Sequence, residues 1–283
     1  METQPSFNEL FEVRYCPAPE DIVYYDTQAL RDQFLITDLF IPDQIRLVYT
    51  HFDRMVVAGV MPVNDKISLV PAEYMKTEFF NKERETGIIN VGGKGKVVAD
   101  GVTYELDYKD ALYLARGVRE ISLESHQSDH PAKFYLNSCL AHKELTSKKI
   151  SRDQAHPVHL GAQKNTNLRV LNQYIAPDNV TTCQLMMGIT EIKEGNAWNT
   201  MPCHIHTLRM EAYFYFEISE QEAVCHFMGQ PQETRHLWVH NNECILSPDW
   251  SLHAAAGTQN YCFIWGMAGS DSDVDAVMTK DLR

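Results

Sequence analysis

The amino-acid sequence predicts an all-β fold, made of barrels or sandwiches of short strands with few short helices. Short apolar runs, rich in β-branched and aromatic residues, are broken by Gly, Pro, Asn or Asp about every ten residues. Several runs alternate with the period of two that a half-buried strand requires, as in EAYFYFEI at 211–218 and EAVCHFMG at 222–229. Asp100-Gly101 separates two further runs, and this dipeptide favours a tight β-hairpin.

Helical patterns are scarce, which agrees with this fold class. Thr27 to Leu35 predicts one short helix, with Thr27 as its N-cap residue. Ser270 to Met278 predicts a second short helix near the end of the sequence.

The sequence predicts two β-domains, at residues 1–150 and 151–283. A polar, breaker-rich stretch at residues 145–169 is typical of a connection between domains. The segments on either side share an order of features, namely an apolar strand, a variable stretch, a glutamate (Glu85 or Glu211), a hairpin and a final apolar strand. This order favours duplication of one β-unit, although any two β-domains share such features in outline.

Composition argues against several classes of function. The formal net charge of −13 is opposite to the lysine and arginine excess that binding to nucleic acid or to an anionic membrane requires. No stretch has the ~20 apolar residues that span a bilayer, and the N-terminus lacks the basic and apolar regions of a secretion signal. The seven cysteines are odd in number and scattered, so we expect free thiols and a cytoplasmic protein.

The most specific spacing in the chain predicts a metal site in the second domain. His204 and His206 are two residues apart, so on a strand both imidazoles point to one face. Glu211 has the opposite parity and joins them only if the chain turns between Met201 and Glu211. His253 must come from a distant strand, which a barrel brings across. Three imidazoles and one carboxylate suit zinc, iron, manganese, nickel or cobalt, and they leave coordination positions open.

The metal prediction depends on the whole set of four residues, because an isolated His-x-His pair also occurs on ordinary exposed strands. The other histidines have no comparable spacing. His156 and His159 lie in the connection between the domains, and His226, His236 and His240 are compatible with the core, the surface or a place beside the metal. The first domain has no His-x-His set, so we expect no metal there.

Two levels of resemblance follow from these residues. His-x-His-x4-Glu with a distant histidine resembles the motifs of cupins, although the usual glycine after the glutamate and asparagine after the last histidine are absent. A more specific resemblance, which extends over nearly the whole chain, is to the bacterial 5-keto-4-deoxyuronate isomerase family. The segments that carry it are WNTMPCHIHTLRMEAYFYF, MGQPQETRH, SPDWSLH, FIWGM, KDLR, TQALRDQFLI, GIINVGGKG and DALYLARG.

This resemblance implies a bicupin subunit with two jelly-roll barrels, the first without metal and the second with one Zn2+ ion, often within a hexamer. It also implies a ketol isomerase, an aldose–ketose isomerase, that converts 5-dehydro-4-deoxy-D-glucuronate to 3-deoxy-D-glycero-2,5-hexodiulosonate. That reaction belongs to pectin degradation within carbohydrate metabolism. The substrate follows from the resemblance and not from composition or spacing.

An isomerisation of this kind requires a base that moves a proton between adjacent carbons. Glu233 and Arg235, in one polar segment, are the candidate catalytic residues, with Glu233 as the base; a solvated turn is the competing interpretation. Tyr213, Tyr261 or a metal-bound water are other candidate bases. Arg209 and Tyr213 are the candidate substrate-binding residues, and Arg209 or Arg235 would bind the substrate carboxylate.

Two other classes of function fit the same pattern. A different metal cupin enzyme, such as an iron dioxygenase or another sugar isomerase, would use the same ligands. A non-catalytic sugar-binding cupin would keep the pocket without any turnover. Trp198 and Trp265 are candidates to wall such a pocket, although tryptophans in β-proteins lie more often in the core.

Overall fold

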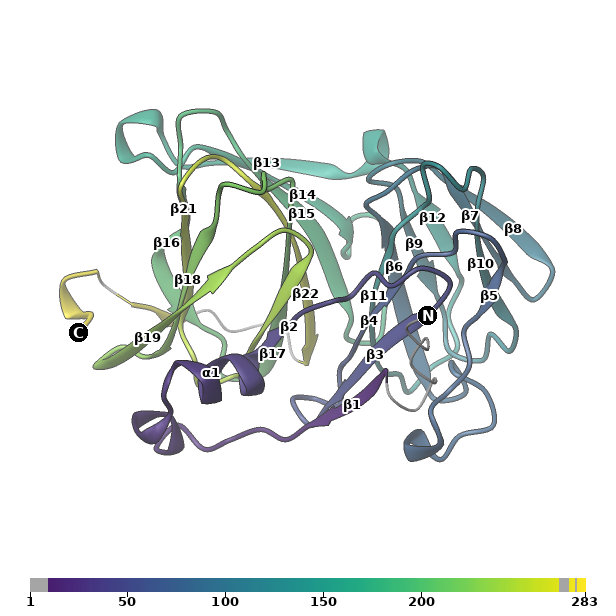
Figure 1. Cartoon of the computed structure of the whole chain (residues 1–283), viewed down its shortest axis with the longest axis horizontal. Coiled ribbons are helices and arrows are strands. Elements are labelled where there is room, and N and C mark those ends of the chain that lie inside the picture. The colour runs from purple at the N-terminus through teal and green to yellow at the C-terminus, as the bar shows by residue number, and fades with distance from the viewer. Residues whose placement is uncertain (1–9, 270–274, 278) are drawn as a thin grey trace, which may run out of the picture. The chain divides into compact units, whose positions relative to one another are not determined.

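The computed structural model describes residues 10–269, 275–277 and 279–283, and it confirms the predicted all-β class (Figure 1). The chain forms two compact units. Unit 1 comprises the residues up to 14 together with 38–155 and 174–186. Unit 2 comprises the remaining segments, 15–37, 156–173 and 187–283.

Unit 1 contains a seven-stranded and a four-stranded sheet. In spatial order the larger sheet is β1 (Phe11–Arg14), β3 (Ile45–Thr50), β4 (Val56–Val60), β11 (Phe134–Leu140), β6 (Arg84–Asn90), β9 (Ala111–Leu114) and β12 (Lys148–Ile150). The smaller sheet is β5 (Ile67–Ser68), β10 (Ile121–Ser125), β7 (Gly95–Ala99) and β8 (Val102–Leu106). Side chains from both sheets form one apolar core, including Ile88, Val97 and Leu136. The predicted hairpin is confirmed, since Asp100 and Gly101 link β7 to β8 with positive φ angles of 46° and 81°.

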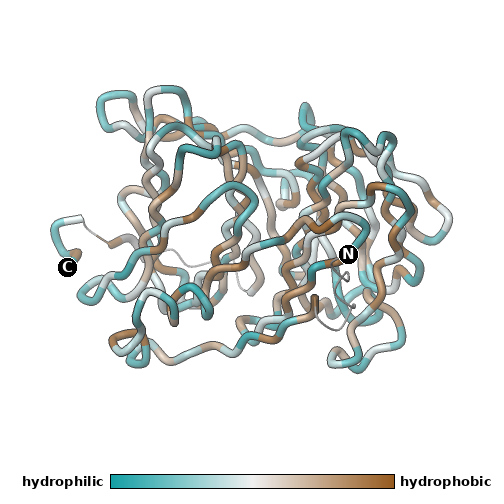
Figure 2. Tube along the Cα trace, in the orientation of Figure 1, coloured by the Kyte–Doolittle hydropathy of each residue, from teal (hydrophilic) through white to brown (hydrophobic). Residues whose placement is uncertain are grey.

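Unit 2 repeats this plan with a seven-stranded and a five-stranded sheet. The larger sheet is β13 (His156–Leu160), β14 (Arg169–Ile175), β15 (Met186–Ile192), β22 (Cys262–Gly269), β17 (Arg209–Phe216), β20 (Glu243–Ser247) and β2 (Leu35–Ile36). The other sheet is β19 (Glu233–Val239), β18 (Val224–Gln230), β21 (His253–Gly257), β16 (Trp198–Ile205) and β23 (Asp275–Ala276). Hydrophobic residues lie mainly along the strands, and many connecting loops are hydrophilic (Figure 2).

The described part of the chain contains one α-helix, α1 (Thr27–Phe34), and several 3-10 helices. The helix lies where the sequence predicts it, but the predicted N-cap was wrong by one residue: the Asp26 carboxylate, not Thr27, accepts the Ala29 N–H at 2.8 Å. The 3-10 helices are η2 (Asp21–Tyr24), η3 (Glu73–Met75), η4 (Arg152–Gln154), η5 (Gln163–Asn165) and η6 (Thr279–Asp281).

The second predicted helix, from Ser270 to Met278, falls largely outside the described residues. Residues 270–274 and 278 are not described, and Asp275–Ala276 form strand β23 rather than helix. This strand pairs with β16, which also carries His204.

Two segments cross the domain boundary expected at residue 150. Residues 15–37 belong to unit 2 because β2 extends its larger sheet, with Leu35 paired to Ile245. Residues 174–186 belong to unit 1, where the buried Glu85 carboxylate accepts the backbone N–H groups of residues 183–185, each at 2.8 Å.

Glu85 and Glu211, which the sequence pairs as counterparts, point to different sides of their sheets. On β6, Ile88 lies in the apolar core, and Thr86 shares its face by the alternation of a strand. Glu85 therefore faces the other side, where it binds the backbone and accepts the Tyr113 hydroxyl at 2.7 Å. The position on β6 that matches Glu211 is Thr86, because Arg84 and Arg209 begin the two strands and lie opposite the last residues of β11 and β22.

No helix among the described residues is long and apolar enough to span a membrane. All seven cysteines, each within the described residues, are free thiols as expected.

Candidate metal centre

Three strands of unit 2 bring the predicted metal ligands together. His204 and His253 are direct partners across the ladder between β16 and β21. Glu211 lies on β17, in the larger sheet. His206 directly follows β16, at the start of a turn over residues 206–208 that leads into β17. This turn removes the parity conflict between the His-x-His pair and the glutamate that the sequence presents.

The ligand atoms of these four residues converge on one point. The His204 Nε2 atom lies 3.0 Å from His206 Nε2 and 3.1 Å from His253 Nε2. The Glu211 Oε2 atom lies 3.4 Å from His206 Nε2 and 3.3 Å from His253 Nε2. His206, Glu211 and His253 are buried, and His204 is partly buried.

These separations fit a common metal ion. For ligand atoms about 2.1 Å from a metal, a separation of about 3.0 Å corresponds to a right angle, and about 3.4 Å to a tetrahedral angle. The three Nε2 atoms face one another, which is also the arrangement that lone pairs directed at one ion produce. The Glu211 Oε2 atom is buried without a hydrogen-bond donor. The three-histidine group can therefore hold a metal ion.

The protonation state of the histidines suits metal binding. Burial, together with the neighbouring His206, lowers the pKa of His204 from its ordinary value to about 4. Burial, together with His204 and His206, lowers the pKa of His253 well below the ordinary value. Both rings are therefore neutral near pH 7, and only the neutral imidazole offers a lone pair to a metal.

The outer ring nitrogens of two histidines lie close to polar side chains. The Ser247 hydroxyl lies 3.4 Å from His253 Nδ1 and can accept its hydrogen, which directs the Nε2 lone pair of this ring at the cluster. Arg209 borders the cluster as the sequence predicts, with Nη2 3.2 Å from His206 Nδ1 and with a buried Nε–H that has no acceptor. A guanidinium group only donates, so a hydrogen bond there requires the proton of His206 on Nε2, whereas a metal bond through Nε2 requires it on Nδ1.

Tyr213 borders the cluster from the larger sheet. Its ring centroid lies 5.2 Å from that of His253, and the side chain is buried. Burial, with the Glu211 carboxylate nearby, raises the pKa of Tyr213 well above its ordinary value. Burial also raises the pKa of Tyr261. Both phenols therefore stay protonated near neutral pH, which favours hydrogen-bond donation over action as a base.

Glu233 and Arg235 lie on the edge strand β19. Glu233 is exposed and forms an ion pair with Arg235, whose Nη1 lies 2.7 Å from its carboxylate. Arg235 pairs with Met228 on β18, the neighbouring strand. No contact among the described residues joins either side chain to the histidines, so their catalytic roles stay predictions.

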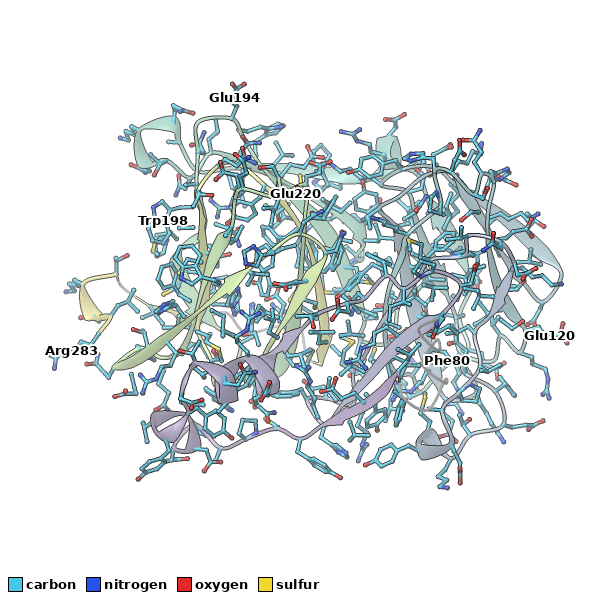
Figure 3. The ribbon with its side chains drawn as sticks, viewed as in Figure 1. Phe80, Glu120, Glu194, Trp198, Glu220 and Arg283 are labelled. Atoms are coloured by element: carbon cyan, nitrogen blue, oxygen red, sulfur yellow. The ribbon has the colours of Figure 1, made fainter. Side chains whose placement is uncertain are left out.

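The two tryptophans that were candidates for the pocket wall face different sides. Trp198 stacks on Phe227, with ring centroids 5.6 Å apart, and its side chain lies on the outside of the strands (Figure 3). Trp265 pairs with Tyr213 across the ladder between β22 and β17, so it shares the face that carries Glu211.

Four more residues line the same interior; sequence reasoning assigned none of them a function, although it left His226 open as a residue beside the metal. The Arg169 charge acts on Tyr213 and Tyr261, and Asn199 is paired with Ala255 on β21. His226, fully buried on β18, has its Nδ1 atom 2.6 Å from the Tyr215 hydroxyl. Tyr215 could have been found from the sequence, because it lies two residues after Tyr213 and therefore shares the face of β17 that carries Glu211 and Tyr213. Nothing in the sequence marks Arg169.

Comparison with known proteins identifies the family. A sequence model of the KduI/IolB family matches residues 39–283. The chain belongs to the KduI/IolB family. Among curated relatives, the 4-deoxy-L-threo-5-hexosulose-uronate ketol-isomerase of Formosa agariphila is 47% identical over 276 residues, which cover 96% of this chain and 99% of the relative. The Escherichia coli protein of the same name is 45% identical over 263 residues, covering 91% and 95%.

Solved structures support the fold assigned to this KduI/IolB family member. An IolB-like protein from Salmonella typhimurium superposes with a TM-score of 0.63 at 14% identity, covering 79% of this chain and 87% of that one. An oxalate decarboxylase from Lactobacillus farciminis gives a TM-score of 0.58 at 11% identity, covering 82% and 83%. At these identities the likeness concerns the fold alone, and it agrees with the predicted all-β jelly-roll class.

Proposed function

We propose that this chain is a metal-dependent ketol isomerase that converts 5-dehydro-4-deoxy-D-glucuronate to 3-deoxy-D-glycero-2,5-hexodiulosonate. The observation that carries the proposal is the identity of 47%, over 96% of the chain, to a curated relative named for this activity. The geometry of unit 2 adds support, because a cluster of neutral imidazoles and one carboxylate borders a buried polar interior.

In this proposal, His204, His206, Glu211 and His253 hold one divalent metal ion, which we take to be zinc. The mutual distances of 3.0–3.4 Å between their ligand atoms and the nitrogen-rich donor set support this assignment. A bound zinc ion would supply Lewis-acid stabilisation of the negative charge that develops on the substrate oxygens.

The surrounding side chains bind and orient the substrate. Ketol isomerisation moves one proton between adjacent carbons and another between their oxygens. The negative charge on these oxygens changes during the reaction, so hydrogen-bond donors must lie close to them throughout. Tyr213 stays protonated beside Glu211 and is suited to donate to such an oxygen. Arg209, with Nη2 3.2 Å from His206 Nδ1, is the sequence-based candidate for binding the substrate. Glu233 is the sequence-based candidate for the base, with Arg235 as its ion-pair partner.

Assembly, metal identity and cellular setting are the finer parts of the proposal. We propose a homo-hexamer in the cytoplasm that acts in pectin degradation on a small-molecule uronate, with no nucleic-acid or membrane partner. These assignments rest on the sequence resemblance described above, whereas the names of the relatives bear on the isomerase activity alone. Light scattering would measure the assembly, and elemental analysis of protein purified without added metal would identify the ion. A monomer, or protein without zinc, would contradict the corresponding assignment.

The decisive experiment measures conversion of freshly prepared 5-dehydro-4-deoxy-D-glucuronate by NMR. We expect the metal-loaded protein to form the ketol product, and both chelation and the Glu211→Gln substitution to abolish conversion. A matched Glu220→Gln variant, altered at an exposed glutamate, should keep full activity (Figure 3). Metal-loaded protein that converts nothing would refute the proposed function.

A further inference from the structure

The interior of unit 2 contains an unusual concentration of buried polar atoms without partners. Among the described residues, six such side-chain atoms belong to unit 2, and unit 1 contributes Gln44 Nε2 and Asn137 Oδ1. The six are Asn199 Nδ2, Arg209 Nε, Glu211 Oε2, His226 Nε2, Tyr261 Oη and Trp265 Nε1. Each unsatisfied buried group costs about 1–3 kcal/mol, so such a cluster indicates a place that another molecule fills.

The strand register places these atoms on facing inner surfaces. Asn199 on β16 and His226 on β18 both pair with Ala255 on β21, so they share one face of the five-stranded sheet. Tyr213 and Trp265 share one face of the larger sheet. The two faces meet, because the His226 and Tyr213 ring centroids are 5.4 Å apart. We call this interior, bounded by the six residues and the metal cluster, the donor chamber.

Three of the six unpartnered atoms can only donate hydrogen bonds. Asn199 Nδ2, Arg209 Nε and Trp265 Nε1 carry N–H groups and no accessible lone pair. Glu211 Oε2 is the sole obligatory acceptor among the six, and it belongs to the metal cluster. The chamber therefore has a surplus of donors and must match a ligand rich in acceptor oxygens.

His226 adds one more donor, because its neighbour fixes its tautomer. The buried Tyr215 hydroxyl lies 2.6 Å from His226 Nδ1, the acceptor available to its proton. Nδ1 therefore accepts, and the hydrogen of the neutral ring resides on Nε2, the orphaned atom. Tyr215 acts as a positioning residue for this N–H group.

Arg169, at the start of β14, brings a positive charge close enough to the donor chamber to act on Tyr213 and Tyr261. Its Nη1 atom donates to the Asn167 carbonyl oxygen at 2.9 Å, and no carboxylate among the described residues forms an ion pair with it. Of the other candidate cations, Arg235 is ion-paired with Glu233, and Arg209 lies with Nη2 3.2 Å from His206 Nδ1. A half-buried arginine with a free edge suits bidentate binding of a carboxylate.

We propose that the donor chamber binds the anionic, oxygen-rich sugar acid itself, with Arg169 holding its carboxylate and the His226 Nε2–H group donating to a ketol oxygen. This assignment deepens the proposed isomerase function and rests on it for the identity of the substrate. The donor surplus and the uncompensated arginine are independent of that function.

A kinetic comparison tests the role of Arg169. We expect Arg169→Met to raise KM for the uronate about 10- to 100-fold with a smaller change in kcat, and Arg169→Lys to restore part of the loss. Arg46→Met is the matched control. Like Arg169, Arg46 is partly buried, but it lies in unit 1 and forms an ion pair with Glu12. Equal KM values for Arg169→Met and Arg46→Met would overturn the assignment.

His226 requires a different kinetic signature. We expect His226→Phe to lower kcat about 10- to 1000-fold with little change in KM, and His226→Gln, which keeps an N–H donor, to retain more activity. Tyr215→Phe should lower kcat by a smaller factor than His226→Phe, since it removes the hydrogen bond that orients the His226 ring but keeps the ring itself. A loss that tracks melting temperature or metal content across these variants would overturn the role of His226.

A binding measurement separates this inference from the proposed function. Calorimetry on metal-loaded wild-type protein should show D-glucuronate binding more tightly than D-glucose, which lacks the carboxylate, and Arg169→Met should remove the preference. If the wild type isomerises no uronate yet keeps this preference, the function fails and the donor chamber stands. If glucuronate has no advantage over glucose, or neither sugar binds, the donor chamber fails whatever the activity.

Discussion

Acid sensitivity offers a quantitative test of the buried interior of unit 2, through the single substitution His226→Gln. His226 is fully buried between Tyr215 and Tyr213, two protonated phenols that offer its ring no counter-charge. Burial lowers the pKa of His226 from 6.5 to about 3. The folded protein therefore keeps this ring neutral at pH values where the unfolded chain protonates it.

The sign and size of the effect follow from proton linkage. Between the two pKa values the unfolded state binds more protons, so the free energy of unfolding falls as the pH falls from about 6.5 toward about 3. At about pH 4 the difference spans about 2.5 pH units, which at about 1.4 kcal/mol per unit corresponds to about 3 kcal/mol. His226→Gln removes this contribution, so the variant should lose about 3 kcal/mol less than the wild type between about pH 7 and pH 4.

Urea unfolding at the two pH values, on chelator-treated protein, measures this difference. Treatment with chelator keeps proton competition at the metal ligands equal in all samples. His236→Gln is the matched control, because His236 is exposed on the neighbouring strand β19 and should leave the acid loss unchanged. Equal acid losses in the wild type and His226→Gln would refute the claim that His226 is buried in its neutral form.

Three further predictions concern the metal site and the first unit. Chelation should lower the melting temperature of wild-type protein, whereas Glu211→Gln should respond less; equal responses would argue against Glu211 as a ligand. Ser247→Ala should weaken metal affinity about 10- to 100-fold in a chelator competition, because Ser247 orients His253 from 3.4 Å; unchanged affinity would contradict this role. Glu85→Gln should cost about 2–4 kcal/mol and speed amide exchange at residues 183–185, and unaltered exchange would show that these bonds contribute little.

Local patterns made the clustering of the four candidate ligands predictable from the sequence. Alternation along a strand predicts that His204 and His206 point to one side, and the same alternation joins Glu211 to Tyr213. Because Glu211 lies an odd number of residues from His204 and His206, the sequence requires a turn between them, and the structure has one at residues 206–208. The partner strand of His253 could not be derived in this way, because the pairing of β16 with β21 depends on how the whole barrel closes.

One error of the sequence-based prediction was local, and the others concern contacts between distant segments. Asp26, one residue before the predicted Thr27, caps α1 by accepting the Ala29 N–H. The addition of β2 to the sheet of unit 2 depends on pairing with β20, more than 200 residues away in the chain. Arg169 has no motif around it, and its importance arises only from its place beside Tyr213 and Tyr261.

The two units show how one β-framework supports an apolar core in one case and a polar interior in the other. Along β6 the inward positions are Thr86 and Ile88, and Ile88 packs in an apolar core with both sheets. At the matching positions of β17 stand Glu211 and Tyr213, so the space that hydrocarbon fills in unit 1 is bordered by polar atoms in unit 2.

Such a chamber has a thermodynamic consequence. Orphaned donors cost free energy until a ligand supplies acceptors, so unit 2 gains more from an oxygen-rich ligand than its contact area alone indicates. In unit 1 the carboxylate of Glu85 is satisfied by its own backbone and by Tyr113, and two unpartnered buried side-chain atoms are found there against six in unit 2, among the described residues. Under the proposed assignment, the unsatisfied donors of unit 2 would favour a substrate that offers several acceptor oxygens over one that offers few.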